Sequence, residues 1–169
     1  MFYTEHYMSP LGGITLASDG DALIGLWFDG QRYYADVIDG QPVADNPSLP
    51  VFIITYRWLD IYFSGRQPDF TPPLLMLTTP FRKAVWEALL AVPYGQTITY
   101  GKIAKQIADL KGLGKMSAQA VGGAVGHNSI SLIIPCHRVV GSNGSLTSYA
   151  GGIDRKRRLL ELERFPLRV

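Results

Sequence analysis

The residues best suited to chemistry are Cys136, His137 and Arg138, because a thiol, an imidazole and a guanidinium follow one another directly. Cys136 is the only cysteine in the chain. A thiolate is a strong nucleophile near neutral pH, and a neighbouring histidine and arginine lower the pKa of a free cysteine from about 8.5. A single cysteine in an apolar run is equally typical of core packing. These three residues alone therefore leave both interpretations open.

Composition indicates what kind of protein carries this thiol. The chain has 169 residues, 47% hydrophobic and 18% charged, as expected of a globular protein with a real core. One cysteine excludes an internal disulfide framework, and the scattered histidines His6, His127 and His137 lack the paired spacing of a zinc site. From the sequence we expect neither a signal peptide nor a membrane-spanning stretch. We expect a cytoplasmic monomer with no metal, no cofactor and no membrane partner.

Charge is divided between two regions of the chain. Residues 1–75 carry three basic and nine acidic side chains, a net charge of −6, whereas residues 76–169 carry thirteen basic and five acidic ones, a net charge of +8. Lys and Arg gain affinity for phosphates through counterion release, so the basic region that contains Cys136 favours a polyanionic partner. A solvated helix face is the alternative explanation of such a cluster.

The first region is predicted to be a small antiparallel sheet with one helix. Turn residues separate its short β-prone runs, which is typical of a meander. A helical pattern begins at Pro50 and ends before Gly65, and the proline-rich stretch 67–77 predicts an extended linker. We therefore predict two domains, 1–75 and 76–169. The expected strands are 2–8, 13–17 and 22–28.

The second region is predicted to be mostly helical. Two short helices joined by a compact loop, 100–109 and 117–125, are typical of a helix-turn-helix, and a further helix begins at Pro80 behind the capping residue Thr79. The helix 117–125 is poor in bulky side chains. Because glycine costs a helix up to ~1 kcal/mol, close approach of its backbone to another surface is the natural explanation. That surface is either DNA or a neighbouring helix.

A pattern of segments in this region points to a known family. It consists of PCHRVVG at 135–141, AVGGA at 120–124, Asn128, and YAGG at 149–152. The pattern resembles the O6-alkylguanine-DNA alkyltransferases, also called methylated-DNA-protein-cysteine methyltransferases, over residues 79–165. The resemblance implies an α+β fold with a ribonuclease H-like N-terminal domain and a mostly helical C-terminal domain that carries the helix-turn-helix. The implied partner is double-stranded DNA carrying O6-alkylguanine.

The resemblance also implies an activity and its catalytic residues. The alkyl group of O6-alkylguanine, with O4-alkylthymine as a further candidate, is transferred irreversibly to Cys136 in a single turnover. His137 takes the thiol proton through a water and Glu163 orients the imidazole. Because adjacent residues do not face each other in a regular helix or strand, a bridging water suits Cys136 and His137. Asn128 is implied as the hinge between the recognition helix and the active-site strand.

The same resemblance implies the residues that contact DNA. Tyr100 helps to turn the damaged nucleotide out of the duplex, because the O6 atom lies inside the paired stack. Tyr149 belongs to the loop over the extruded base and Lys156 lies near its pocket. The full set of expected DNA contacts is Tyr100, Gln119, Ala120, Gly122, Arg138, Tyr149 and Lys156.

The chain departs from the family pattern at two places. Gln119 stands where the family usually has an arginine that inserts into the duplex, and glutamine lacks the planar cation that stacks and attracts phosphate. The segment 109–115 is longer than usual, so the inserting residue is alternatively Lys115 or Met116.

Three rival functions are disfavoured. A non-catalytic lesion binder of the same fold has a tryptophan in place of Cys136. A Cys-His hydrolase normally has its cysteine and histidine far apart in sequence. A fused DNA-repair regulator needs zinc-binding cysteines that this chain lacks.

Overall fold

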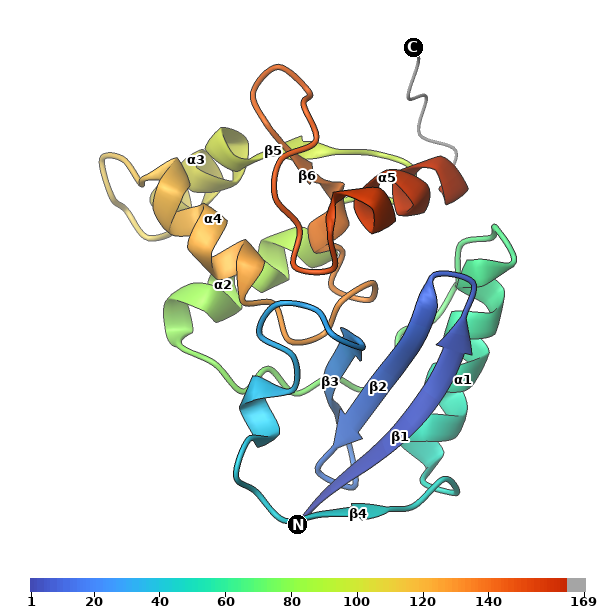
Figure 1. Cartoon of the computed structure of the whole chain (residues 1–169). Coiled ribbons are helices and arrows are strands. Elements are labelled where there is room, and N and C mark those ends of the chain that lie inside the picture. Colours follow the sequence, from blue (N-terminus) through green and yellow to red (C-terminus); the bar gives the residue numbers. More distant parts are fainter. Residues whose placement is uncertain (164–169) are drawn as a thin grey trace. The chain divides into compact units, whose positions relative to one another are not determined.

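A computed structural model describes residues 1–163 of the chain, which divide into two compact units (Figure 1). The N-terminal unit consists of Met1–Leu77 together with Ser129–Ser131. The C-terminal unit consists of Thr78–Asn128 and the residues from Leu132 on. Residues 164–169, at the end of the predicted second domain, lie outside the described residues.

The N-terminal unit is built on a four-stranded sheet in the order β3-β2-β1-β4. Its first three strands form the predicted antiparallel meander. The short β4 pairs parallel to β1, so the sheet is mixed. A strand of three residues is too short to show an alternating pattern, which is why the sequence did not predict it. The strands are β1 (Phe2–Ser9), β2 (Gly12–Ser18), β3 (Leu23–Phe28) and β4 (Val43–Asp45).

Strand β3 lies at the centre of the N-terminal core, since every one of its residues is buried. Helix α1 (Pro50–Phe63) contacts β1 and β2, and a short 3-10 helix, Asp36–Ile38, adds Ile38 to the core. The predicted linker is indeed extended, but it also hydrogen-bonds to β3, because Leu75 N donates to Leu23 O at 2.9 Å. Ser131 N donates to Leu26 O at 2.9 Å, which places this later segment in the same unit.

The C-terminal unit contains four helices and a two-stranded parallel ladder among the described residues. Hydroxyl side chains cap the first three of these helices, and the sequence predicted the cap at Thr79. Thr79 accepts a bond from Arg82 N, and Thr99 accepts one from Lys102 N. Ser117 accepts bonds from the amides of the second and third residues of its helix. The elements are α2 (Pro80–Leu90), β5 (Ile98–Thr99), α3 (Tyr100–Leu110), α4 (Ala118–Gly126), β6 (Val139–Val140) and α5 (Ile153–Leu162).

Helices α2, α3 and α4 pack on one another and present the helix-turn-helix. Their buried faces carry apolar side chains, and Trp86 Nε1 donates to Ala124 O at 2.9 Å, which fixes α2 to α4. The opposite side of α4 exposes Gln119, Ala120 and Gly123. Within residues 1–163, no helix has the length and apolar character needed to cross a membrane.

Candidate active site and nucleic-acid interface

Cys136 lies in a 3-10 turn, Cys136–Arg138, directly before β6. The family pattern led us to expect a strand here. Instead the backbone turns, because Cys136 N donates to Ile134 O at 2.8 Å and Arg138 N donates to Pro135 O at 3.0 Å. Cys136 is only 4% exposed. The thiol is therefore held on a tight turn with little contact with solvent.

Asn128 fixes the chain that leads into this turn. It follows α4 closely, and its buried side chain donates from Nδ2 to Ile134 O at 2.7 Å. Between them the backbone reverses at Leu132, which has a left-handed φ of 70°. Asn128 thus joins the end of α4 to the segment before Cys136, and its hinge role stays a prediction.

His137 and Glu163 form a buried pair. Nε2 of His137 lies 2.6 Å from Oε2 of Glu163, and both side chains are fully buried. Burial lowers the pKa of His137, although the hydrogen bond and charge of Glu163 act to raise it. A neutral imidazole that donates from Nε2 to a carboxylate carries its lone pair on Nδ1. Glu163 therefore selects the tautomer of His137.

Glu163 directly follows α5, and both oxygens of its carboxylate accept hydrogen bonds. Arg138 donates to it from Nε at 2.8 Å and from Nη2 at 3.1 Å, and Gly95 N donates at 3.1 Å. Burial acts to raise the pKa of Glu163, but the hydrogen bonds and charges of His137 and Arg138 outweigh it and hold that pKa far below its usual range. Glu163 is therefore ionised at neutral pH.

Arg138 is a buried member of the same network. It is 8% exposed, and besides its two bonds to Glu163 it donates from Nη1 to Val92 O at 2.8 Å. Its guanidinium lies over the Tyr94 ring at 5.7 Å from the centroid. The structure thus places Arg138 in the network around Glu163, and its expected contact with DNA stays a prediction.

Lys156 is likewise fully buried, and its expected contact with DNA stays a prediction. Its Nζ donates to the backbone carbonyls of Val139 and Ser148. Burial lowers the pKa of Lys156 to about 8, while the charge of a Cys136 thiolate acts in the opposite direction. Lys156 is therefore a cation within electrostatic reach of the thiol, and its hydrogen bonds hold β6 and the loop that follows it.

The remaining expected DNA contacts lie at the surface. Gln119 and Ala120 are exposed at the start of α4, and Gly122 is half-buried one turn further along. Tyr100 begins α3, with its ring beside Gly122, where an added Cβ would lie 3.9 Å from the ring. Tyr149 is half-buried in the loop that leads to α5.

Sequence reasoning missed Gly95, which completes the network. Gly95 has a φ of 77°, and a Cβ there would lie 3.2 Å from Glu163 O, so only glycine fits without strain. The run Pro93-Tyr94-Gly95 signalled the end of a helix, but nothing local shows that its amide meets a carboxylate 68 residues away.

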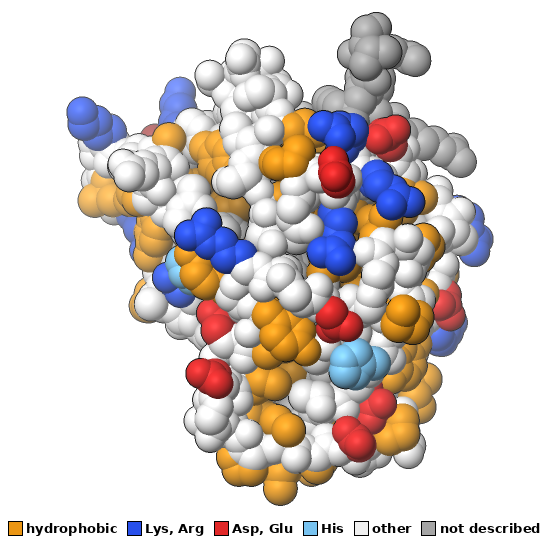
Figure 2. Space-filling model, viewed as in Figure 1, with side chains coloured by type: hydrophobic (Ala, Val, Ile, Leu, Met, Phe, Trp, Pro, Cys, Tyr) orange, Lys and Arg blue, Asp and Glu red, His pale blue; other side chains and the backbone are white. Residues whose placement is uncertain are grey.

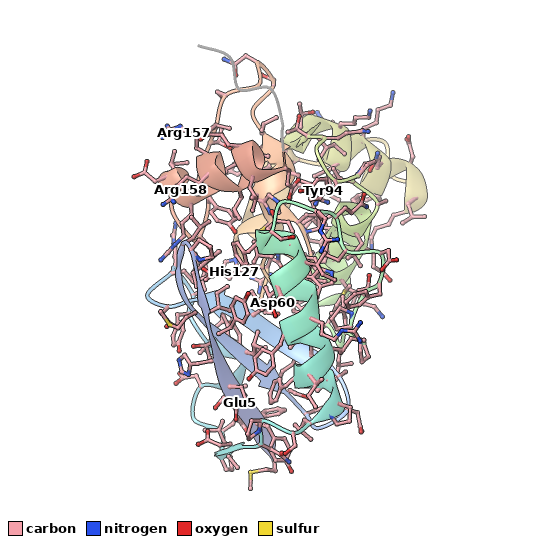
Figure 3. All side chains as sticks on the ribbon, turned by 90° about the vertical axis from the view of Figure 1, so that its right-hand side faces the viewer. Glu5, Asp60, Tyr94, His127, Arg157 and Arg158 are labelled. Carbon is pink, nitrogen blue, oxygen red and sulfur yellow. The ribbon has the colours of Figure 1, made fainter. Side chains whose placement is uncertain are left out.

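Several basic side chains are exposed on the C-terminal unit. Figure 2 shows many Lys and Arg side chains on the visible face of the C-terminal unit. Arg157 and Arg158 project outward from α5 (Figure 3), and Lys111 and Lys115 are exposed in the loop between α3 and α4. Among residues 1–163 no cluster of His, Cys, Asp and Glu is arranged to hold a metal ion.

We expect the free energy of unfolding to decrease as the pH falls. The pKa of His137 lies below its ordinary 6.5 in the folded protein, so below about pH 6.5 the unfolded chain binds a proton that the folded protein does not. The pKa of Glu163 also lies below its ordinary 4.5, so a second loss begins near that pH and continues downward. Urea unfolding at a series of pH values measures both losses. A His137→Gln variant should lack the loss that begins near pH 6.5. If its free energy of unfolding depends on pH as strongly as that of the parent, the assignment to His137 is contradicted.

The fold and the site together define a class: a helix-turn-helix protein whose buried cysteine adjoins a His–Glu–Arg network. Residues 80–165 match the family model described as 6-O-methylguanine DNA methyltransferase, DNA binding domain, and residues 2–76 match the ribonuclease-like domain of the same family. The chain belongs to the 6-O-methylguanine DNA methyltransferase family, and the predicted α+β fold is confirmed.

Relatives in several organisms support this membership. The methylated-DNA–protein-cysteine methyltransferase of Mycobacterium tuberculosis is 43% identical over 92% of this chain and 88% of its own length. The protein of that name in Methanosarcina acetivorans is 40% identical over 95% of this chain and 97% of its own. The crystal structure of Mycobacterium tuberculosis OGT in complex with DNA is similar with a TM-score of 0.81 and 42% identity, covering 96% of this chain and 92% of that one.

Proposed function

We propose that this protein repairs double-stranded DNA by transferring the alkyl group of O6-alkylguanine to its own Cys136. The observation that carries the proposal is the position of Cys136, on a tight turn beside a buried His137–Glu163 pair. The methylated-DNA–protein-cysteine methyltransferases that resemble this chain, and the OGT crystallised with DNA, support it.

The buried pair suits His137 to act as the base. Burial keeps the imidazole neutral, and Glu163 holds the proton on Nε2, so Nδ1 accepts the thiol proton through a bridging water. The imidazolium formed in this way lies against an ionised carboxylate, which stabilises it. Arg138 keeps that carboxylate charged and in place. His137 and Glu163 thus act together to produce the Cys136 thiolate.

The transfer is a single displacement. Cys136 Sγ attacks the alkyl carbon and forms a C–S bond while the bond from that carbon to O6 breaks. The electron pair of the broken bond passes to the guanine ring, and the proton that left the thiol ends on N1, so normal guanine is released. The thioether on Cys136 is stable, and each protein molecule therefore acts once.

The guanine must leave the duplex before it can reach Cys136. A base modified at O6 pairs poorly, which lowers the cost of extrusion. Tyr100 and Gln119 lie at the starts of α3 and α4, where they can turn the nucleotide and fill the gap. The exposed small residues of α4 allow its backbone to approach the groove closely, and the basic loop with Lys111 and Lys115 adds contacts to phosphate.

Gln119→Arg is expected to speed repair of a duplex about two- to fivefold, because arginine adds a planar cation that stacks and attracts phosphate. Single-turnover assays with an O6-methylguanine duplex measure the change. Transfer from the free O6-methylguanine base, which needs no extrusion, should not change. A duplex rate equal to that of the parent would contradict this role. A gain from Met116→Arg alone would move the inserting residue to position 116.

Titration with excess substrate tests the proposed function. The protein is mixed with increasing amounts of duplex carrying one O6-methylguanine, and the repaired guanine is counted. Repair should stop at one guanine per protein molecule. Continued repair beyond that ratio would show a turnover mechanism in which Cys136 is not the final acceptor.

A further inference from the structure

A hydrogen bond joins Tyr100 to the loop after β6. Oγ1 of Thr147 donates to the phenol oxygen of Tyr100 at 2.9 Å. Both residues are half-buried and lie 47 positions apart in the sequence. None of the roles described above has been assigned to Thr147.

The parallel ladder brings these two segments together. In the pairing of β5 with β6, Thr99 lies opposite Val140. Tyr100 follows the first of these residues and Gly141 follows the second. The start of α3 and the start of the loop are therefore neighbours by register.

A tight turn at Gly141 then sets the position of Thr147. Gly141 N donates to Ser145 O at 2.9 Å, which closes the turn. A Cβ on Gly141 would lie 2.6 Å from Ser145 Oγ and 3.3 Å from Thr147 Cγ2. The Thr147 methyl therefore packs against Gly141, and its hydroxyl is directed to Tyr100.

The direction of the bond determines what Tyr100 can do. Because the phenol oxygen accepts from Thr147, the phenol's own hydrogen takes no part in this bond. A hydroxyl that accepts one hydrogen bond becomes a better donor in the next. With its ring beside Gly122 on α4, Tyr100 is held on two sides.

We propose that Thr147 is a positioning residue for Tyr100, which orients the phenol so that its hydrogen is donated to the extruded nucleotide. The inference depends on the proposed function, because it assumes that a nucleotide enters beside Tyr100. Thr147 itself does not touch the reacting atoms. It acts through the bond to Tyr100.

The test compares Thr147→Val, which removes the hydroxyl and keeps the shape, with Thr147→Ser, which keeps the hydroxyl. Single-turnover transfer is measured over a range of concentrations of O6-methylguanine duplex. We expect Thr147→Val to lower the saturating rate constant about three- to tenfold, as for one lost hydrogen bond, with little change in the half-saturating concentration. Thr147→Ser should restore the rate. If valine at this position crowds Gly141, Thr147→Ala removes the hydroxyl with a smaller side chain and serves the same purpose.

A double-mutant cycle with Tyr100→Phe separates positioning from general support of the loop. In the Tyr100→Phe background, Thr147→Val should have no further effect. Ser142→Ala, which removes an exposed hydroxyl from the same loop, should behave like the parent. An unchanged or faster Thr147→Val variant, or an equal loss in both backgrounds, would overturn the inference. No transfer by the parent would instead overturn the proposed function.

Discussion

Cys136→Ser is expected to abolish alkyl transfer, with a loss of at least about 10³-fold. A serine hydroxyl has a far higher pKa than a thiol, so the His137–Glu163 pair cannot produce the oxyanion near neutral pH. The side chain is almost the same size, and the buried turn around it should stay intact. Single-turnover assays with an O6-methylguanine duplex measure the loss.

Binding of the lesion provides the control for this variant. The proposed DNA contacts lie on α3, α4 and the basic surface, none of which the substitution changes. Cys136→Ser should therefore bind the lesion duplex about as tightly as the parent in a gel-shift or anisotropy assay. Transfer that persists in this variant would show that another residue accepts the alkyl group.

Glu163→Gln is expected to reduce both stability and activity. The substitution removes the charge that compensates Arg138, and breaking a buried ion pair by removing one partner costs about 3–5 kcal/mol. The melting temperature should fall by roughly 6–20 °C for a chain of this size. Without the carboxylate, His137 loses its fixed tautomer, so the transfer rate should fall about 10²–10⁴-fold.

The neighbouring Glu161 offers a matched control. Glu161 is exposed near the end of the same helix, so Glu161→Gln removes the same charge without touching the network. It should leave the melting temperature and the transfer rate close to those of the parent. Thermal unfolding and single-turnover transfer are compared for both variants. Equal effects at the two positions would show that the charge near the end of α5, and not the buried network, is responsible.

Most of the secondary structure follows from local patterns in the sequence. Turn residues separate the strands of the meander, and Thr79 caps its helix at the predicted position. Strand β4 and the β5–β6 ladder were missed, because segments of two or three residues carry no periodic signal. Their pairing depends on contacts distant in sequence.

The candidate site was partly predictable. Cys136 and His137 stand out by residue type, and the family resemblance points to Glu163, which the structure places 2.6 Å from the imidazole. Arg138 and Lys156 were assigned to DNA because the family resemblance implies those contacts. Both are buried, since each finds partners that its neighbours in sequence do not reveal. Tertiary structure alone shows that these charges serve the network and the loop.

Peptide mass spectrometry after a single exposure to duplex carrying O6-methylguanine tests the central claim most directly. The protein is digested and the peptide containing Cys136 is compared with its untreated counterpart. A gain of one methyl group on Cys136, matched by its loss from the DNA, is the predicted result. An unmodified Cys136 in a protein that binds the lesion duplex, or a methyl group on another residue, would contradict alkyl transfer to this thiol.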